Sequence, residues 1–184
     1  MNKGFALTFL LLFTYTLSRG EDKDHGPLQA VSSLDLSRYT GKWYEIARLP
    51  NKFQKDCAAD VVATYALLEG GQLKVVNQCR RENGQINQAE GRARLASKSG
   101  PNSKLKVRFA PSWLSWLPRV WGDYWVIELA EDYSHSVVGT PDRNYLWILS
   151  RTPQMEEEKY KRVIEKAAAA GFDVARVMRT RQAS

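Results

Sequence analysis

The sequence predicts an all-β domain, an antiparallel barrel or sandwich, that ends in one C-terminal α-helix. Between residues 42 and 150, short strand-like segments are separated by turn residues about every 8–12 positions, which is typical of antiparallel barrels and sandwiches. After residue 152, apolar residues recur at helical spacing instead. A chain of 184 residues, 43% of them hydrophobic, is long enough for one domain with a sizeable core.

Residues 1–20 have the pattern of a cleaved export signal. Lys3 is followed by an apolar run over residues 5–17 and then by small residues at 18–20. A run of about 13 apolar residues is too short to span a bilayer stably, and the flanking pattern favours a signal peptide over a buried core helix. No cysteine stands near the cleavage region, which disfavours a lipid-anchored bacterial lipoprotein. We therefore predict a soluble, exported protein.

The remaining chain divides into a leader, residues 21–33, and one domain, residues 34–184. The leader is polar, contains Gly26-Pro27 and lacks periodicity, so we expect it to be mobile. The net charge of +7 falls to +5 without the signal, since Lys3 and Arg19 are two of the 27 basic residues. The basic residues are scattered, which indicates a solvated surface or mild attraction to anionic lipid. No nucleic-acid-binding signature is present, so we predict no nucleic-acid partner.

Eight strands are expected. The first ends at Pro50, which has no N–H to donate, and contains the strand-favouring residues Trp43, Tyr44 and Ile46. Glycine in 69–71 and 82–84 supplies the positive φ of hairpin turns. The expected strands cover residues 42–49, 60–68, 72–78, 88–95, 104–109, 123–129, 136–139 and 145–150.

The period changes after Thr152-Pro153. Residues 154–170 carry an apolar face, an acidic start and later basic residues, a pattern that predicts an amphipathic helix with Gly171 as its C-cap. Its charged face should be solvated and its apolar stripe should pack on the outside of the sheet. Residues 172–177 are predicted to form a short ninth strand.

Three blocks in this order are similar to those of the lipocalin family. Gly41-Lys42-Trp43 matches the first block, residues 131–136 look like the second, and residues 149–153 look like the third. The second block departs from the usual pattern at Glu131 and Ser136. The resemblance, which runs from about residue 34 to residue 177, implies an eight-stranded antiparallel up-and-down barrel, the lipocalin calyx, with one C-terminal α-helix and a short ninth strand. It also implies that Gly41, Trp43 and Arg151 close the barrel base, with the arginine across the tryptophan ring.

Within the family, the chain resembles the bacterial lipocalins and apolipoprotein D. The similar segments are 43–47, 63–65, 74–77 and 141–149. The resemblance implies a small hydrophobic ligand, such as a fatty acid or lysophospholipid, held by inward-facing residues. The expected ligand-binding residues are Glu45, Tyr65, Asn77, Val107, Phe109, Trp113, Trp116 and Trp147.

Alternation along the strands of such a barrel predicts which side chains face inward. If Trp43 points inward, so do Glu45 and Ala47 on the first strand, and Tyr145, Trp147 and Leu149 on the eighth. Ala89, Gly91 and Ala93 alternate with charged residues and would leave room for a ligand. The alternative is a barrel filled by its own side chains. Glu45 is either a buried group satisfied by an arginine, tyrosine or asparagine, or the group that holds the polar end of a ligand.

The segment 112–121 joins the fifth and sixth strands, which in this topology meet at the open mouth. It carries Trp113, Trp116 and Trp121 with two leucines beside Arg119. We interpret the Trp-rich loop, Trp113–Trp121, as a ligand gate that also contacts a membrane or hydrophobic partner, because exposed apolar patches mark such sites. The alternative is a loop folded back to plug the mouth.

Cys57 and Cys79 are the only cysteines, in a chain predicted to be exported. Cys57 precedes the second expected strand and Cys79 ends the third, both at the mouth. Because these adjacent antiparallel strands would bring the two cysteines within bridging range, we predict a disulfide. The alternative is a free thiol near the mouth, as in the isomerase branch of the family.

Little in the sequence favours catalysis, so we expect a binding protein and not an enzyme. His25 lies in the leader and His135 in a tight turn, no cluster has metal-ligand spacing, and no cofactor is expected. The predicted function is transport of the hydrophobic ligand in the cell envelope. The expected location is the periplasm or outside the cell, with peripheral contact to the outer membrane as a further alternative. The alternatives are an isomerase or hydrolase using a pocket thiol or Glu45, and a membrane-associated stress protein acting through the Trp-rich loop. The sequence gives no prediction of oligomeric state.

Overall fold

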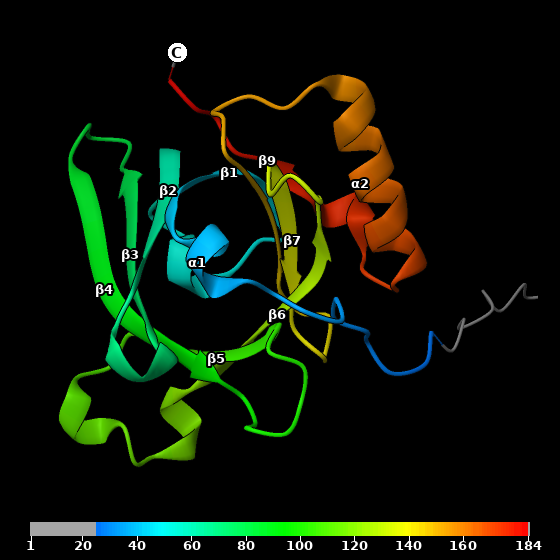
Figure 1. Cartoon of the computed structure of the whole chain (residues 1–184). Helices are drawn as coiled ribbons and strands as arrows, with labels where there is room; N and C mark the ends of the chain where they lie inside the picture. The colour runs from blue at the N-terminus through cyan, green and yellow to red at the C-terminus, as the bar shows by residue number, and fades with distance from the viewer. Residues whose placement is uncertain (1–24, 184) are drawn as a thin grey trace, which may run out of the picture.

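The computed structural model describes residues 25–183, so the expected signal peptide, residues 1–20, lies outside the described residues. Eight antiparallel strands form a closed barrel in which each strand pairs with its sequence neighbour and β1 pairs with both β2 and β8 (Figure 1). The all-β barrel with a C-terminal helix is therefore confirmed, and the sandwich alternative is wrong. The strands are β1 Gly41–Arg48, β2 Ala59–Leu67, β3 Leu73–Arg80, β4 Ile86–Leu95, β5 Lys104–Arg108, β6 Gly122–Leu129, β7 His135–Gly139 and β8 Leu146–Ser150.

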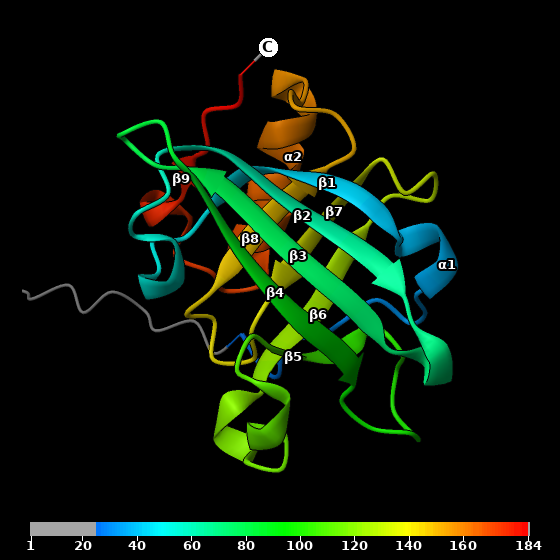
Figure 2. The ribbon, with the colours of Figure 1, turned by 90° about the vertical axis from the view of Figure 1, so that its left-hand side faces the viewer.

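The two ends of the barrel are built differently. The short helix α1, Leu36–Tyr39, lies across the base, and Asp35 caps it by accepting from the N–H groups of Ser37 and Arg38 (Figure 1). The other end of the barrel, the mouth, carries four connections, which are β1–β2, β3–β4, β5–β6 and β7–β8. Figure 2 views the barrel from the side, with α1 at one end and the β3–β4 hairpin at the other.

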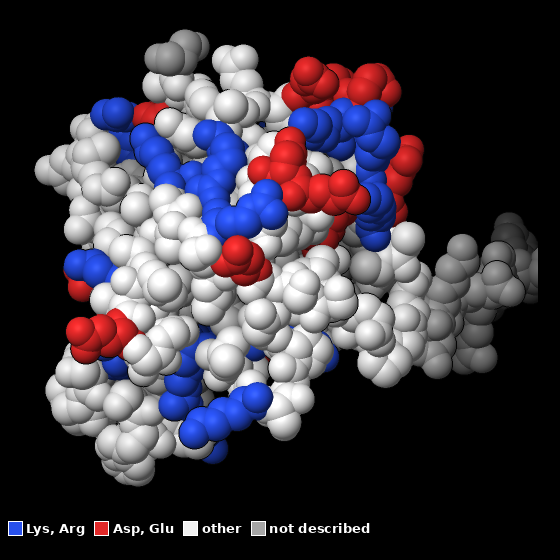
Figure 3. Space-filling view, viewed as in Figure 1, with Lys and Arg blue, Asp and Glu red and all other residues white. Residues whose placement is uncertain are grey.

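The helix α2, Glu157–Ala169, packs against the outside of the barrel. Its Val163 and Ala167 belong to an apolar layer with Val137 and Ile148, separate from the core inside the barrel. The structure starts the helix three residues later than the sequence predicts, with Glu156 as its N-cap. Basic and acidic side chains alternate on its outer face, as Figure 3 shows at the upper right. Of the described residues, none forms a helix with the length and apolar character needed to cross a membrane.

The ninth strand is shorter and later than expected. Residues 174–176 form a 3₁₀ turn, and β9 covers only Met178–Arg179, which pair with β1 (Figure 2). A short ninth strand is therefore confirmed, but its predicted bounds, residues 172–177, were wrong. Phe172 is instead buried against Gly139, where its ring leaves no room for a Cβ. That contact anchors the chain between α2 and β9.

The C-terminal segment completes the wall where β1 and β2 separate. Their pairing extends only from Gly41–Tyr65 to Tyr44–Val62. Beyond it, the Gln182 side-chain amide donates to the carbonyl oxygens of Glu45, at 2.8 Å, and of Val61, at 2.9 Å. The C-terminal segment therefore bridges the seam on the mouth side of the barrel.

Part of the stretch that we expected to be a mobile leader contacts the barrel. Leu28 is buried in the layer beneath α2, and the Val31 N–H donates to the Val126 carbonyl at 2.9 Å. Ser103 in turn donates its hydroxyl hydrogen to the Val31 carbonyl. These contacts hold residues 28–31 along β6. They consist of one buried apolar side chain and a few backbone hydrogen bonds, neither of which requires a periodic pattern in the sequence, so the sequence did not predict them.

A β-bulge in β1 changes the inward face of that strand. Glu45 lies opposite Leu149, but Ala47 lies opposite Ile148, so the strand shifts register by one residue between them. Ala47 consequently packs in the outer layer beneath α2. The prediction that Ala47 faces inward was wrong, and Arg48, opposite Trp147, takes the inward position instead.

Candidate ligand-binding site

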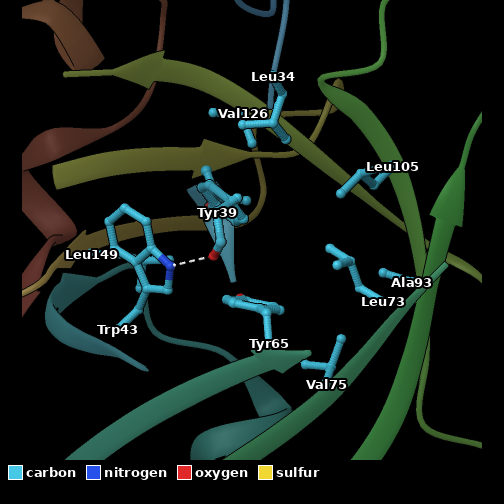
Figure 4. Close-up of a cluster of buried hydrophobic side chains, with 11 residues drawn as sticks. Leu34, Tyr39, Trp43, Tyr65, Leu73, Val75, Ala93, Leu105, Val126 and Leu149 are labelled. Carbon is cyan, nitrogen blue, oxygen red and sulfur yellow. Dashed lines mark hydrogen bonds between the residues drawn. The ribbon is translucent and has the colours of Figure 1, made fainter. Parts of the chain in front are cut away.

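The barrel base is closed by Trp43 and the residues around it. The Trp43 ring is completely buried, and its indole N–H donates to the Tyr39 carbonyl at 2.9 Å (Figure 4). The Arg151 guanidinium lies 3.9 Å from the ring centroid and donates to the carbonyl oxygens of Lys42, at 3.0 Å, and Arg38, at 2.6 Å. Gly41, at φ 90°, lets the arginine approach, because a Cβ there would stand 3.3 Å from its Nη1.

Three tyrosines fill the space above Trp43. The Tyr124 hydroxyl forms hydrogen bonds with those of Tyr39, at 2.9 Å, and Tyr65, at 2.8 Å, and Tyr39 also reaches Ser136 at 3.2 Å. Burial raises the pKa of all three phenols above the ordinary value, so they stay protonated at neutral pH. The lower half of the barrel is thus a packed core, completed by residues such as Leu73, Val75, Leu105 and Val126.

Tyr65 belongs to this packed base, although the resemblance implied that it contacts ligand. It is only 5% exposed, and its ring lies 5.4 Å from that of Tyr39. Val107 is half-buried against the same core. Sequence reasoning missed Tyr39 and Tyr124, because a four-residue helix and a single tyrosine within a strand carry no distinguishing pattern.

The middle of the barrel carries a buried polar network. Arg48 Nη1 donates to Glu45 Oε1 at 2.8 Å, and the Gln54 amide donates to Glu45 Oε2 at 2.6 Å. The hydroxyl of Thr180 also donates to Glu45 Oε1. Gln54 Oε1 accepts from the Trp147 indole N–H at 2.8 Å. Glu45 is therefore a buried carboxylate satisfied by an arginine, a glutamine and a threonine, and Arg48 and Gln54 are site residues that sequence reasoning missed.

The arginine was missed because its position depends on the bulge. Strict alternation from Trp43 places Arg48 outside the barrel, and no feature of the sequence locates the bulge. Gln54 lies in a mouth connection, where a 3₁₀ turn over Lys52–Gln54 is capped by Asn51. That cap orients Gln54 toward Glu45 and Trp147.

The mouth half is less filled than the base. Asn77 lies opposite Ala63 on β2 and Ala89 on β4, in the register that faces inward, yet both Asn77 and Ala89 are exposed. Phe109 is 42% exposed and contacts Gly91, where an added Cβ would stand 2.5 Å from the Arg108 carbonyl. Small residues on β4 thus keep solvent access to inward-facing positions near the mouth.

Trp147 forms the opposite side of this half. Its ring is stacked on that of Tyr145, with centroids 5.8 Å apart and planes 10° apart, and Tyr145 in turn lies 5.7 Å from Phe53. Trp147 is half-buried. The mouth half therefore combines aromatic surface with a few polar groups, which is the usual lining of a site for a small amphiphile.

The Trp-rich loop projects from the mouth. Trp113 is 73% exposed and Trp116 is 75% exposed, so neither ring plugs the barrel. Trp121 instead packs on the outer wall, with Arg94 at 4.1 Å from its ring centroid and Arg108 at 5.2 Å. Two 3₁₀ turns, Ser112–Leu114 and Pro118–Val120, shape the loop.

Cys57 and Cys79 form the predicted disulfide, with their Cα atoms 5.5 Å apart. The bond links the β1–β2 connection to the mouth end of β3. His135 begins β7, outside the barrel, where its Nε2 lies 3.6 Å from Glu128 Oε1. Within residues 25–183, no three His, Cys, Asp or Glu side chains are grouped closely enough to hold a metal ion.

One surface hollow, of about 450 Å³, lies outside the barrel between residues 25–31 and α2. It is lined by Leu28, Ile127, Ala167 and the charged residues Glu128 and Lys166, which form an ion pair at 2.7 Å. Because those charges already neutralise each other and the exposed inward-facing residues lie elsewhere, we place the candidate site in the mouth half of the barrel.

A closed eight-stranded up-and-down barrel with a packed base and a helix on its outside defines a calyx-type binding protein. Residues 34–182 match the family model described as a lipocalin-like domain, and the chain belongs to the lipocalin family, which binds small hydrophobic ligands.

Named relatives support this assignment. The chain is 44% identical to temperature-induced lipocalin-1 of Arabidopsis thaliana over 84% of this chain and 83% of the relative. It is 37% identical to the outer membrane lipoprotein Blc of Escherichia coli, over 83% of this chain and 81% of the relative. It is also 32% identical to apolipoprotein D of Rattus norvegicus, over 94% of this chain and 90% of the relative. Among solved structures, insecticyanin from Manduca sexta shares the fold, with a TM-score of 0.63, 22% identity and 83% coverage of both chains.

Proposed function

We propose that this protein is an exported carrier that binds one small amphiphile, a fatty acid or lysophospholipid, in the mouth half of the barrel. The observation that carries the proposal is the contrast between the packed base and the exposed inward-facing residues Asn77, Ala89 and Phe109. A ligand there would bury apolar surface against Trp147 and Phe109. Membership of the lipocalin family and the similarity to an outer membrane lipoprotein support the ligand class and the envelope location.

Binding, and not turnover, is the role that the site favours. The thiols that an isomerase route would need are joined as Cys57–Cys79. The carboxylate of Glu45 already accepts three hydrogen bonds, so it is poorly placed to act as a general base. A carrier needs only the shape and the polarity of the site.

A pair of variants on β3 tests the binding site. Asn77 faces inward and Gln78 faces outward, and both are exposed. We expect Asn77→Trp to lower the affinity for a fluorescent fatty acid by at least about 10-fold, because the new ring fills the space that the acyl chain would occupy. Gln78→Trp adds the same ring outside and should leave affinity within about 2-fold of wild type. Equal affinities of the two variants would contradict a ligand site in the mouth half.

We also propose that the Trp-rich loop contacts a lipid surface when ligand is loaded or released. Its exposed Trp113 and Trp116 would enter the headgroup region, and Arg119 beside them suits anionic lipid. The loop then acts as the gate between membrane and barrel.

The expected result is that Trp113→Ser/Trp116→Ser reduces partitioning onto anionic phosphatidylglycerol vesicles by about 10-fold or more, as measured by co-sedimentation. Leu67→Ser is the control, since Leu67 is 50% exposed but lies at the base end of β2. Unchanged vesicle binding and lipid transfer in the tryptophan variant would show that the loop serves neither purpose.

A further inference from the structure

Arg48 has hydrogen-bond donors that the protein leaves unused. Its side chain is 8% exposed, and within residues 25–183 only Nη1 forms hydrogen bonds, to Glu45 at 2.8 Å and to Thr180 at 3.2 Å. Nε is buried and has no partner among the described residues. A buried donor without an acceptor is destabilising, so its persistence calls for an explanation.

The carboxylate next to it does not satisfy that donor. Both Glu45 oxygens are already in use, one by Arg48 Nη1 and Thr180 and the other by Gln54. The contact between Arg48 and Glu45 runs through a single nitrogen, and not through the two parallel bonds of a bidentate pair. The guanidinium therefore remains able to donate to a further oxygen.

The position of Arg48 fits the head of a bound amphiphile. The bulge in β1 turns it inward, opposite Trp147. Gln54 fixes the Trp147 ring, which Tyr145 stacks upon, so an acyl chain running along these rings would start at the guanidinium. Guanidinium groups bind anionic oxygens of carboxylates and phosphates by charge-assisted hydrogen bonds.

We propose that Arg48 binds the anionic head oxygen, carboxylate or phosphate, of the amphiphile held in the barrel. The proposal rests on the proposed function, because it assigns one end of the same ligand. Glu45 acts as a positioning residue that holds the guanidinium and moderates its charge. The site thus selects an anionic head over a neutral head on the same acyl chain.

The test is the affinity ratio between ligands that share an oleoyl chain: oleate, oleoyl lysophosphatidic acid and the neutral glycerol ester monoolein. Wild type should prefer the anionic ligands. Glu45→Gln/Arg48→Gln removes both charges without leaving one of them unpaired, and should lower the oleate-to-monoolein ratio by about 10–100-fold. Glu45→Gln alone retains the cation and should raise the ratio. If the double variant loses affinity for oleate alone, the site binds a carboxylate. If it loses affinity for both oleate and oleoyl lysophosphatidic acid, the site binds a carboxylate or a phosphate.

Arg48→Lys provides a second variant if the double variant fails to fold. It keeps the charge of the pair but lacks the Nε–H, so the ratio should fall about 3–10-fold while the thermal midpoint stays near that of wild type. Ratios equal to wild type in the folded Arg48 variants, with monoolein still bound, would overturn the role of Arg48 and leave the carrier function standing. Failure of wild type to bind any of the three ligands would instead overturn the carrier function.

Discussion

Replacing Trp43 with alanine is expected to lower the unfolding free energy by about 3–5 kcal/mol. The ring is fully buried, donates to the Tyr39 carbonyl and supports the Arg151 guanidinium. Its loss leaves a cavity between the tyrosine cluster and Arg151. Urea denaturation followed by far-ultraviolet circular dichroism measures the change.

Trp116→Ala is the control for that experiment. Trp116 is 75% exposed, so its removal should change stability by no more than about 0.5 kcal/mol. A cost below about 1 kcal/mol for Trp43→Ala would show that the base is held by other contacts and that Trp43 does not close the barrel.

Replacing both Cys57 and Cys79 with alanine is expected to cost roughly 3 kcal/mol, the chain-entropy value for a closed loop of this length. The bond spans 22 residues and ties the β1–β2 connection to β3. The loss should appear as a lower denaturation midpoint in urea under oxidising conditions. Because Gln54 lies in the same connection, ligand affinity should fall as well.

The reductant supplies the matched control for the disulfide. Wild type in excess reductant should approach the stability of the double alanine variant, and the variant itself should not respond to the reductant. A stability equal to that of oxidised wild type in the double variant would contradict a constraining role for this bond.

Much of the fold was predictable because it depends on local patterns. Alternating apolar segments and glycine turns indicated eight strands, and the helical period indicated α2. Both patterns arise because one face of each element is apolar and packs against a core. The pairing of Cys57 with Cys79 followed from the predicted export and the order of the strands.

The features that were missed depend on contacts between distant residues. The bulge after Glu45 is set by the pairing with β8, and it decides that Arg48 and not Ala47 faces inward. The helix α1 is too short to show a period, so the burial of Tyr39 was not foreseen. The bridge from Gln182 to Glu45 and Val61 joins residues more than a hundred positions apart. The candidate site was therefore located only at the level of the barrel mouth.

Together these features divide the barrel into two halves with separate tasks. Trp43, Arg151 and the three tyrosines form a base whose expected contribution is stability. The mouth half, lined by Asn77, Phe109 and Trp147, is the part of the barrel in which we propose that the ligand binds. Substitutions in the base should therefore alter unfolding more than head-group preference, and those at Arg48 the reverse.

The most direct test of the carrier proposal is native mass spectrometry of the protein purified from its own host, followed by extraction and identification of the lipid. The expected result is one lipid-sized adduct per chain, carrying an acyl chain and an anionic head. The adduct should be absent from Asn77→Trp and retained by Gln78→Trp. An adduct that persists unchanged in Asn77→Trp, or wild type that stays free of lipid even after incubation with oleate, would contradict binding in the mouth half of the barrel.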